Sequence, residues 1–216
     1  MQVDAVVAIT KYLSFISSFA VVGFLLAMSF LLLNRDGALA ESALALRKKA
    51  SLVGLLWFIS SALYITASLA QILDTSFTQA LDLTSLRSFV SQVALGRYLF
   101  AQTVIAFIVG FLLSRIKKVI PALLLLALSL VAIALPALES HSASGGSHAS
   151  AIGSMLLHVI GLSLWVGGLL ALIFISSEDR KVAIKARIIG ISPIAQLTLP
   201  PARWSSRTPK PSHGTV

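Results

Sequence analysis

Long runs of apolar residues, separated by short polar segments, dominate the hydrophobic pattern of this chain. A helix that spans the hydrocarbon core of a bilayer needs about 20 predominantly apolar residues, and backbone groups in lipid must be hydrogen-bonded within the segment. Five runs approach or meet this length, so the pattern predicts an all-α, polytopic membrane helix bundle. The five transmembrane helices are expected at residues 12–33, 52–73, 98–113, 119–138 and 149–175.

The segment between the second and third spans, residues 74–97, is long for a loop and has a helical pattern of its own. Apolar residues recur at helical spacing with Ser and Gln between them, which is typical of a short helix lying in the membrane interface. A connector packed on the protein surface explains the pattern equally well, so both interpretations stay open. The apolar positions are Leu83, Leu86, Phe89, Val90 and Val93.

The composition agrees with a membrane protein and excludes several other classes. Of the 216 residues, 57% are hydrophobic and 12% are charged, whereas a soluble domain carries roughly 45–50% apolar and about 25% charged residues. The absence of cysteine from the sequence excludes disulfides, thiolate metal sites and iron–sulfur clusters. We interpret the net charge of +9 as a record of membrane topology, with no nucleic acid among the expected partners.

The distribution of Lys and Arg predicts the orientation of the bundle, because these residues gather in the cytoplasmic loops of membrane proteins. Residues 34–51, 114–118 and 176–190 together carry eleven of them. The connections on the other side carry three, namely Lys11, Arg87 and Arg97. The N-terminus is therefore expected outside and the C-terminus inside.

The first span has an alternative interpretation as a cleaved signal peptide, because Ala38-Leu39-Ala40 resembles a signal-peptidase site. Its apolar run of about 22 residues exceeds the usual 7–15 of such a peptide. We therefore expect the first span to remain in the protein.

After about residue 193 the composition changes abruptly. Five of the seven prolines lie in the last 24 residues, among Ser, Thr, Arg and Lys. Such a segment cannot bury a core and is expected to be a disordered polar tail. The predicted division is a transmembrane domain at residues 1–192 and the tail at residues 193–216. The tail is interpreted either as a cytoplasmic tail or as an unrelated terminus on a C-terminally shortened protein.

Three of the four histidines lie in the last predicted span and the loop before it. His141 and His148 flank the flexible sequence Ser-Ala-Ser-Gly-Gly-Ser. His158 lies inside the span, where an ionisable group usually faces the bundle interior or a water-filled cavity. At 100° per residue, Met155, His158 and Trp165 share one side of the helix. Imidazole binds copper, zinc or iron and a thioether suits Cu(I), so the three histidines and Met155 are the candidate metal ligands.

The spacing of these ligands favours transfer of an ion over one closed site. His148 and His158 are about 15 Å apart along a helix that rises 1.5 Å per residue, which is too far to bind one ion. The loop histidines would capture an ion outside, and His158 would receive it deeper. Each residue also has an ordinary explanation: solvation for the loop histidines, a hydrogen bond to a neighbouring helix for His158 and core packing for Met155.

Small and polar residues in the spans are assigned to helix packing, because small residues let helices approach closely in lipid. Trp165 lies too deep for the interfacial aromatic belt, so it is expected to face a partner helix. The residues expected to pack in this way are Trp165, Gly161, Gly167 and Gly168. Polar groups interpreted as interhelical hydrogen-bonding partners are Ser14, Ser17, Ser18, Ser60, Ser61, Thr66, Gln102 and Thr103.

The sequence contains no signature of an enzyme. It has no Gly-rich phosphate loop with a Lys and no His-Glu-x-x-His motif. No Asp or Glu lies within a predicted span to complete a Ser-His-Asp arrangement. The chain is therefore not expected to be an enzyme.

The region that carries the histidines resembles a known family. Residues 154–158 (Ser-Met-Leu-Leu-His) and residues 164–169 (Leu-Trp-Val-Gly-Gly-Leu) look like the "LH…WVGGL" signature of the copper resistance protein D (CopD) family. The outer loop with His141 and His148 also fits that family. Residues 191–195 are similar to its "R-x-S-x-x-A" start of the next helix.

The resemblance implies a multi-pass protein of the bacterial plasma (inner) membrane that acts in copper transport or tolerance, with copper as its metal and His141, His148 and His158 as ligands. Some relatives are fused to a cytochrome c oxidase assembly domain. The implied partners are therefore the lipid bilayer, the copper ion and an extracytoplasmic (periplasmic) copper carrier or an oxidase-assembly protein. Family members usually continue into further spans, whereas this chain turns polar after Ala195, which favours the shortened-protein interpretation.

Two other functions are compatible with the sequence. A membrane cytochrome with haem b would need axial histidines on facing helices. Only His158 lies clearly inside a span, so the second ligand would come from an outer histidine or another subunit. The other function is a structural or inactive truncated membrane subunit, which would bind neither metal nor haem.

Overall fold

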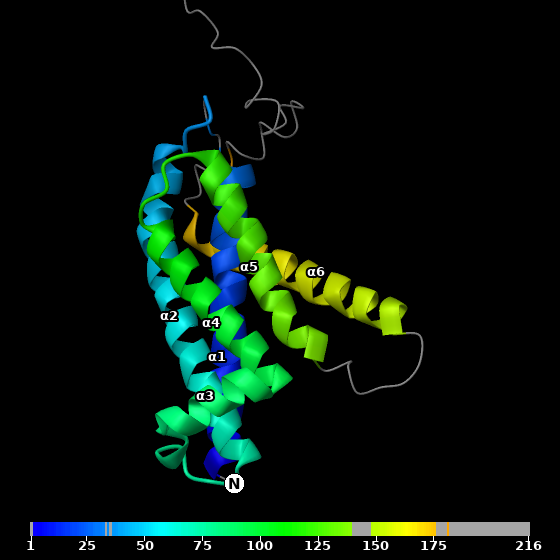
Figure 1. Ribbon diagram of the computed structural model, residues 1–216. Coiled ribbons are helices and arrows are strands. Elements are labelled where there is room, and N and C mark those ends of the chain that lie inside the picture. Colours follow the sequence, from blue (N-terminus) through cyan, green and yellow to red (C-terminus); the bar gives the residue numbers. More distant parts are fainter. Residues whose placement is uncertain (1, 33, 35, 140–147, 176–180, 182–216) are drawn as a thin grey trace, which may run out of the picture.

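The computed structural model describes residues 2–32, 34, 36–139, 148–175 and 181 of the chain. Five of its helices are long and apolar enough to cross a membrane, and they form an elongated bundle (Figure 1). They are α1 (Gln2–Leu26), extended by the π-helical turn η1 (Ala27–Leu31), α2 (Glu41–Ile72), α4 (Ala94–Leu113), α5 (Val119–Glu139) and α6 (His148–Phe174). The predicted all-α fold with five candidate spans is confirmed.

Two of these helices begin well before the apolar runs that predict them. α1 begins at Gln2 and not near residue 12, and α2 begins at Glu41 and not near residue 52. At 1.5 Å per residue, the 32 residues of α2 extend over about 48 Å, which exceeds the roughly 30 Å of a hydrocarbon core. Hydropathy marks only the part of a helix that lies in lipid, and the helical hydrogen bonds continue beyond it.

α1 lies at the centre of the bundle, where it contacts α2, α5 and α6, and α4 packs against both α2 and α5. Buried apolar side chains from these helices form the main core, and Trp57 and Phe24 are among its largest fully buried members. α2 and α4 approach each other closely at two glycines. A Cβ added to Gly54 would lie 2.7 Å from the Cα of Gly110, so no larger residue fits this contact without moving a backbone.

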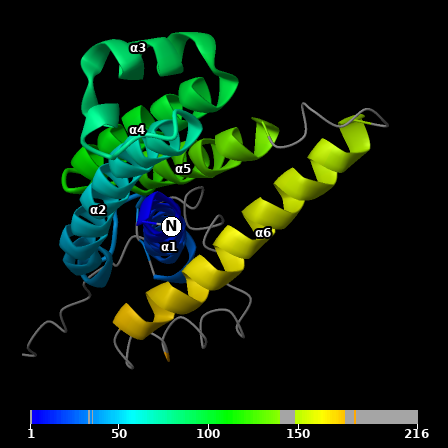
Figure 2. The ribbon, with the colours of Figure 1, turned by 90° about the horizontal axis from the view of Figure 1, so that it is seen from below.

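α6 is the least enclosed of the five long helices. Its C-terminal half packs on α1, where a Cβ added to either Gly23 or Gly167 would collide with the backbone of the other helix. Toward its N-terminus α6 diverges from α1, as two views at right angles show (Figures 1 and 2). Large apolar side chains such as that of Leu157 are consequently exposed along this half.

The segment between α2 and α4 contains the short helix α3 (Leu83–Gln92), which crosses the end of the bundle near the N-terminus (Figure 1). Asp82 caps α3, because its carboxylate accepts hydrogen bonds from the Ser85 backbone N–H at 2.9 Å and the Ser85 hydroxyl at 3.0 Å. Phe89 of α3 is buried against the bundle. The predicted helix is confirmed and packs on the protein, and its position in a membrane interface stays a prediction.

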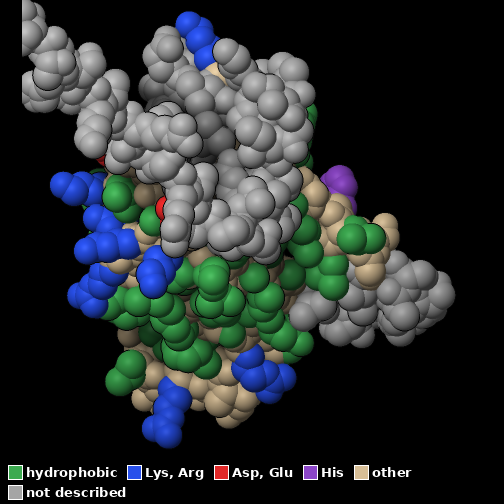
Figure 3. Space-filling model, turned by 90° about the horizontal axis from the view of Figure 1, so that it is seen from above, with side chains coloured by type: hydrophobic (Ala, Val, Ile, Leu, Met, Phe, Trp, Pro, Cys, Tyr) green, Lys and Arg blue, Asp and Glu red, His purple; other side chains and the backbone are tan. Residues whose placement is uncertain are grey.

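At the other end of the bundle, the α1–α2 connection (residues 32–40) and the α4–α5 connection (residues 114–118) are joined to each other. Their backbone hydrogen bonds, both of 3.0 Å, are Leu39 N–H to the Lys117 carbonyl and Val119 N–H to the Gly37 carbonyl. We call this end the basic end, and the opposite one, with α3 and the N-terminus, the N-terminal end. Viewed onto the basic end, Lys and Arg side chains gather along one flank (Figure 3).

Candidate functional site

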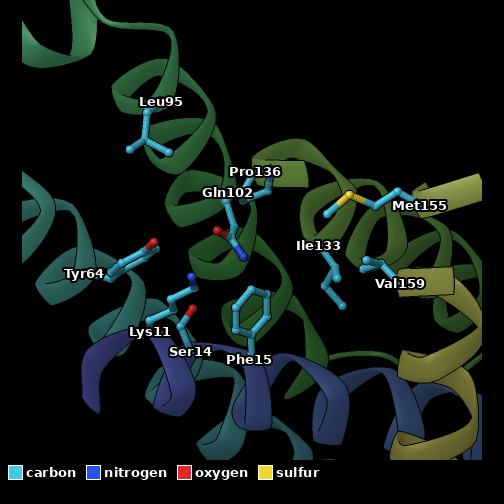
Figure 4. A pocket seen from close by; sticks show the side chains of 10 residues that line it. All are labelled: Lys11, Ser14, Phe15, Tyr64, Leu95, Gln102, Ile133, Pro136, Met155 and Val159. Atoms are coloured by element: carbon cyan, nitrogen blue, oxygen red, sulfur yellow. The ribbon is translucent and has the colours of Figure 1, made fainter. Parts of the chain in front are cut away.

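A cavity of about 260 Å³ lies among the five long helices, in the half of the bundle toward the N-terminal end. Each of these helices contributes to its wall, so the cavity is a property of the assembled bundle (Figure 4). The lining residues are Lys11, Ser14 and Phe15 of α1, Tyr64 of α2, Leu95 and Gln102 of α4, Ile133 and Pro136 of α5, and Met155 and Val159 of α6.

Four polar side chains from three helices converge on this cavity. The Lys11 amine, the Tyr64 hydroxyl and the Gln102 amide point toward one another, with Ser14 beside them (Figure 4). The Ser14 Oγ lies 2.9 Å from the Ser61 Oγ. Gln102 is only 2% exposed, and its amide has no hydrogen-bond partner among the described residues. Buried polar groups normally have such a partner, so the Gln102 amide is available to a bound molecule.

α6 turns one continuous face toward the cavity and α1. Met155 and Val159 line the cavity, and Ser163, Gly167 and Ala171 continue this face as buried residues at intervals of four. The Met155 side chain points into the cavity (Figure 4). Met155 is therefore a candidate metal ligand that the structure places at a cavity.

His158 lies on a different side of α6 from this buried face. The helical spacing groups His158 with Met155 and Trp165, and an ionisable residue in a span is expected to face the interior. In the structure His158 is exposed, because the buried face of α6 centres on Ser163, about 140° from His158 at 100° per residue. Its role as a metal ligand stays a prediction.

The other two candidate histidines belong to the part of the chain that precedes the described side chains of α6. Residues 140–147, with His141, lie outside the described residues, as does the side chain of His148, whose backbone begins α6. Within the described part of the chain, no group of three or more His, Cys, Asp or Glu residues could hold a metal ion. Copper binding by His141, His148 and His158 therefore stays a prediction, and the predicted tail at residues 193–216 also lies outside the described residues.

The four residues expected to pack against a partner helix have different surroundings. Gly167 lies at the α1 contact, where an added Cβ would be 2.9 Å from the Gly23 nitrogen, and an added Cβ on Gly168 would make only an ordinary contact of 3.6 Å with α1. A Cβ on Gly161 would have no neighbour within 4 Å, because Gly161 is exposed on the side of α6 away from its buried face. Trp165 is 68% exposed, because it lies opposite the buried face of α6.

No pattern in the sequence predicts that Lys11, Tyr64 and Gln102 form a group. The sequence uses Lys11 only to predict the orientation of the bundle, and it predicts Gln102 as an interhelical hydrogen-bonding partner. The one sequence feature that points to this polar group is Lys11. It is an ionisable residue at the start of an apolar run, one turn before Ser14. No local pattern brings Tyr64 and Gln102 to the same point, because their meeting depends on which helices become neighbours.

A comparison with known protein families gives a match over most of the chain. Residues 1–151 match the model of a family domain described as "Copper resistance protein D-like, N-terminal domain". The matched region contains α1 to α5 and the first turn of α6, so Met155 and His158 lie just beyond it. No curated protein and no solved structure matches the chain.

Proposed function

Because the chain belongs to the copper resistance protein D-like family, we propose that it acts in copper resistance by binding copper at the outer side of a membrane. In this proposal it passes the ion across the membrane or to an oxidase-assembly partner, and it performs no catalysis. The family match over residues 1–151, which contain four of the five candidate spans, is the observation that carries the proposal.

Residues in the N-terminal half of α6 supply the ligands in this proposal. Met155 and His158 are three residues apart on one helix, so their Cβ atoms are about 5–6 Å apart. A thioether and an imidazole at this separation can reach one copper ion, and both are donors that copper accepts. His141 and His148 precede them in the chain and would deliver copper from outside.

His158 is exposed on α6, so in this proposal its ring needs a partner from outside the described bundle. An ionisable side chain on the lipid-facing side of a spanning helix is costly unless it has a partner. A copper ion would be such a partner. A copper carrier or oxidase-assembly protein docked on this face of α6 would also cover the ring.

Copper titration of the purified full chain tests the proposal. With His141, His148 and His158 replaced together by Ala, we expect the affinity for copper to fall by roughly tenfold or more, because even changes around a metal ligand cost 10–100-fold. His213→Ala is the matched control, since it removes the remaining histidine of the chain, and it should leave the affinity unchanged. An unchanged stoichiometry and affinity in the triple variant would refute the site.

A methionine substitution adds a second arm to the same titration. Met155→Leu removes the thioether, which is a soft donor, so it should weaken binding of Cu(I) more than binding of Cu(II). Met28→Leu is the control, because Met28 is fully buried in the main core. Equal effects of the two substitutions would assign Met155 to packing alone.

An absorption spectrum of the same preparation separates copper binding from the haem alternative. We expect no Soret band. A Soret band that disappears in His158→Ala would replace the copper proposal with a haem-b cytochrome. Cells that lack the protein and keep their normal copper tolerance, together with purified protein that binds neither copper nor haem, would indicate a structural subunit.

A further inference from the structure

We propose that the cavity among the five long helices binds a small organic carboxylate. The carboxylate group would lie between Lys11 and Gln102, and the hydrocarbon part would pack against the apolar wall on the α5 and α6 side. This inference does not depend on the proposed copper site, because the polar contacts come from residues of α1, α2 and α4 that were assigned no metal, although the cavity wall also includes the proposed copper ligand Met155.

The charge of the wall selects for an anion. Lys11 is the one charged residue among the described residues that line the cavity, and these include no Asp or Glu. An ammonium group attracts an anion, and this attraction is stronger in surroundings less polar than water. A carboxylate would supply the opposite charge that the wall lacks.

The hydrogen-bonding groups of the wall match a carboxylate as well. An ionised carboxylate only accepts hydrogen bonds, and it can accept several at once. The Gln102 amide can donate, is nearly fully buried and has no partner among the described residues. The Tyr64 hydroxyl and the Lys11 amine point to the same place (Figure 4). Bonds to a charged acceptor are about twice as strong as neutral ones.

The rest of the cavity favours an organic anion over an inorganic one. Phe15, Ile133 and Val159 form an apolar wall beside the polar group. Small-molecule sites commonly combine a mostly apolar lining with a few convergent polar groups. The volume of about 260 Å³ is many times what one water needs, so it admits a short hydrocarbon chain. Phosphate or sulfate would leave this apolar wall in contact with water.

Ligand-detected NMR on the full chain in phospholipid nanodiscs provides the test, with butyrate as the probe and empty nanodiscs as the blank. Saturation transfer from the protein to butyrate is expected. Butanol and butylammonium have the same hydrocarbon chain without the negative charge, and inorganic phosphate has the charge without the chain. All three should bind at least about tenfold more weakly. Equal binding of butanol, or no saturation transfer to butyrate, would overturn the proposal.

Two substitutions locate the binding. Lys11→Met keeps the length of the side chain and removes its charge, and Gln102→Leu keeps its size and removes its donor. Each should weaken butyrate binding by roughly fivefold or more, as expected for a lost bond to a charged group. Lys48→Met removes an exposed charge near the basic end and should have no effect. Unchanged binding in Gln102→Leu would overturn the assignment even if Lys11→Met failed to fold.

A final arm separates a free carboxylate from an anionic lipid headgroup. Nanodiscs made of phosphatidylcholine alone are compared with nanodiscs that also contain phosphatidylglycerol. A free carboxylate ligand predicts the same butyrate affinity in both. Loss of butyrate binding only in the phosphatidylglycerol nanodiscs would show that the cavity takes a lipid phosphate, and would overturn the carboxylate proposal.

Discussion

Asp82 starts α3 by accepting two hydrogen bonds from Ser85, and these bonds set its acidity. The Ser85 backbone N–H and then the Ser85 hydroxyl hold the pKa of Asp82 below its ordinary value of 3.8. A carboxyl group whose pKa is lowered on folding stabilises the fold at every pH above its unfolded pKa. That contribution is lost as the pH falls through the lower, folded pKa.

The cap therefore gives a pH-dependent prediction for α3. Hydrogen exchange of the α3 amides should accelerate as the pH is lowered past about 3.8 and Asp82 becomes protonated, after correction for the intrinsic exchange rate. Asp82→Ala should accelerate exchange already at neutral pH. Asp82→Asn keeps an acceptor at the cap position, so it should exchange slowly at neutral pH and lack the acid-dependent step. An acid-dependent step that persists in Asp82→Asn would assign it to another group.

Two serine pairs join α1 to α2 inside the bundle, and their geometry predicts different strengths. The Ser14 and Ser61 hydroxyls are 2.9 Å apart, whereas the Ser17 and Ser60 hydroxyls are 3.5 Å apart. Ser17 and Ser60 also donate to carbonyls of their own helices. Their hydroxyl protons are therefore engaged there, and we expect only a weak interaction between the two side chains.

Double-mutant cycles with Ala measure both couplings by unfolding in mixed micelles. The Ser14–Ser61 coupling should be about 0.6 kcal/mol, the average for interhelical hydrogen bonds in membranes. The Ser17–Ser60 coupling should be near zero and serves as the internal control. The opposite order of the two values would contradict the geometry.

The sequence predicted these serines as interhelical groups, and the contact between Ser14 and Ser61 confirms this for that pair. Gln102 was given the same interpretation and is buried without a bond to another described residue. A single sequence cannot separate the two cases, because a polar residue in a span bonds a neighbouring helix or faces a cavity depending on helix rotation.

At the scale of elements, backbone contact at a glycine pair holds α6 to α1. Gly167→Ala places a methyl group against the α1 backbone near Gly23. Overpacking of this kind costs about 1–3 kcal/mol, so we expect the midpoint of unfolding in mixed micelles to fall. Gly161→Ala is the matched control on the same helix, because nothing lies within 4 Å of the added atom, and it should leave stability unchanged or slightly raised. An equal loss of stability in the two variants would contradict a role for the contact between Gly167 and α1.

The existence and type of the long helices could be predicted from the sequence, but the rotation of α6 could not. A helix shows which side it buries when polar residues mark the opposite side. Residues 156–174 are almost entirely apolar, so the pattern leaves the buried face undefined. The spacing correctly grouped His158 with Trp165, and only the packing of Gly167 on α1 reveals that this group is exposed.

At the scale of the whole molecule, the charge distribution and the fold give one prediction of topology. The hydrogen bonds between the two connections at the basic end place both on one side of the bundle, as alternating spans require. A fused alkaline phosphatase, which is active only outside the cytoplasm, should be inactive after Lys118 and active after Thr78. Activity at Lys118 would reverse the predicted orientation, and equal activity at both positions would contradict the spanning bundle.

The arrangement of the helices in the bundle could not be predicted from the sequence. Each span could be predicted from hydropathy, yet the cavity needs all five long helices in a specific arrangement. Hydropathy holds no information about which helix neighbours which, because lipid-facing and helix-facing positions are both apolar. Lys11, Tyr64 and Gln102 are far apart in the chain, and only the fold makes them one site.

The tie between the α1–α2 and α4–α5 connections has a mechanical consequence. Each connection joins two helices into a hairpin, and the backbone hydrogen bonds between the connections add to the helix contacts that hold the two hairpins together. Separation of the hairpins at this end would break these backbone hydrogen bonds as well as the helix contacts.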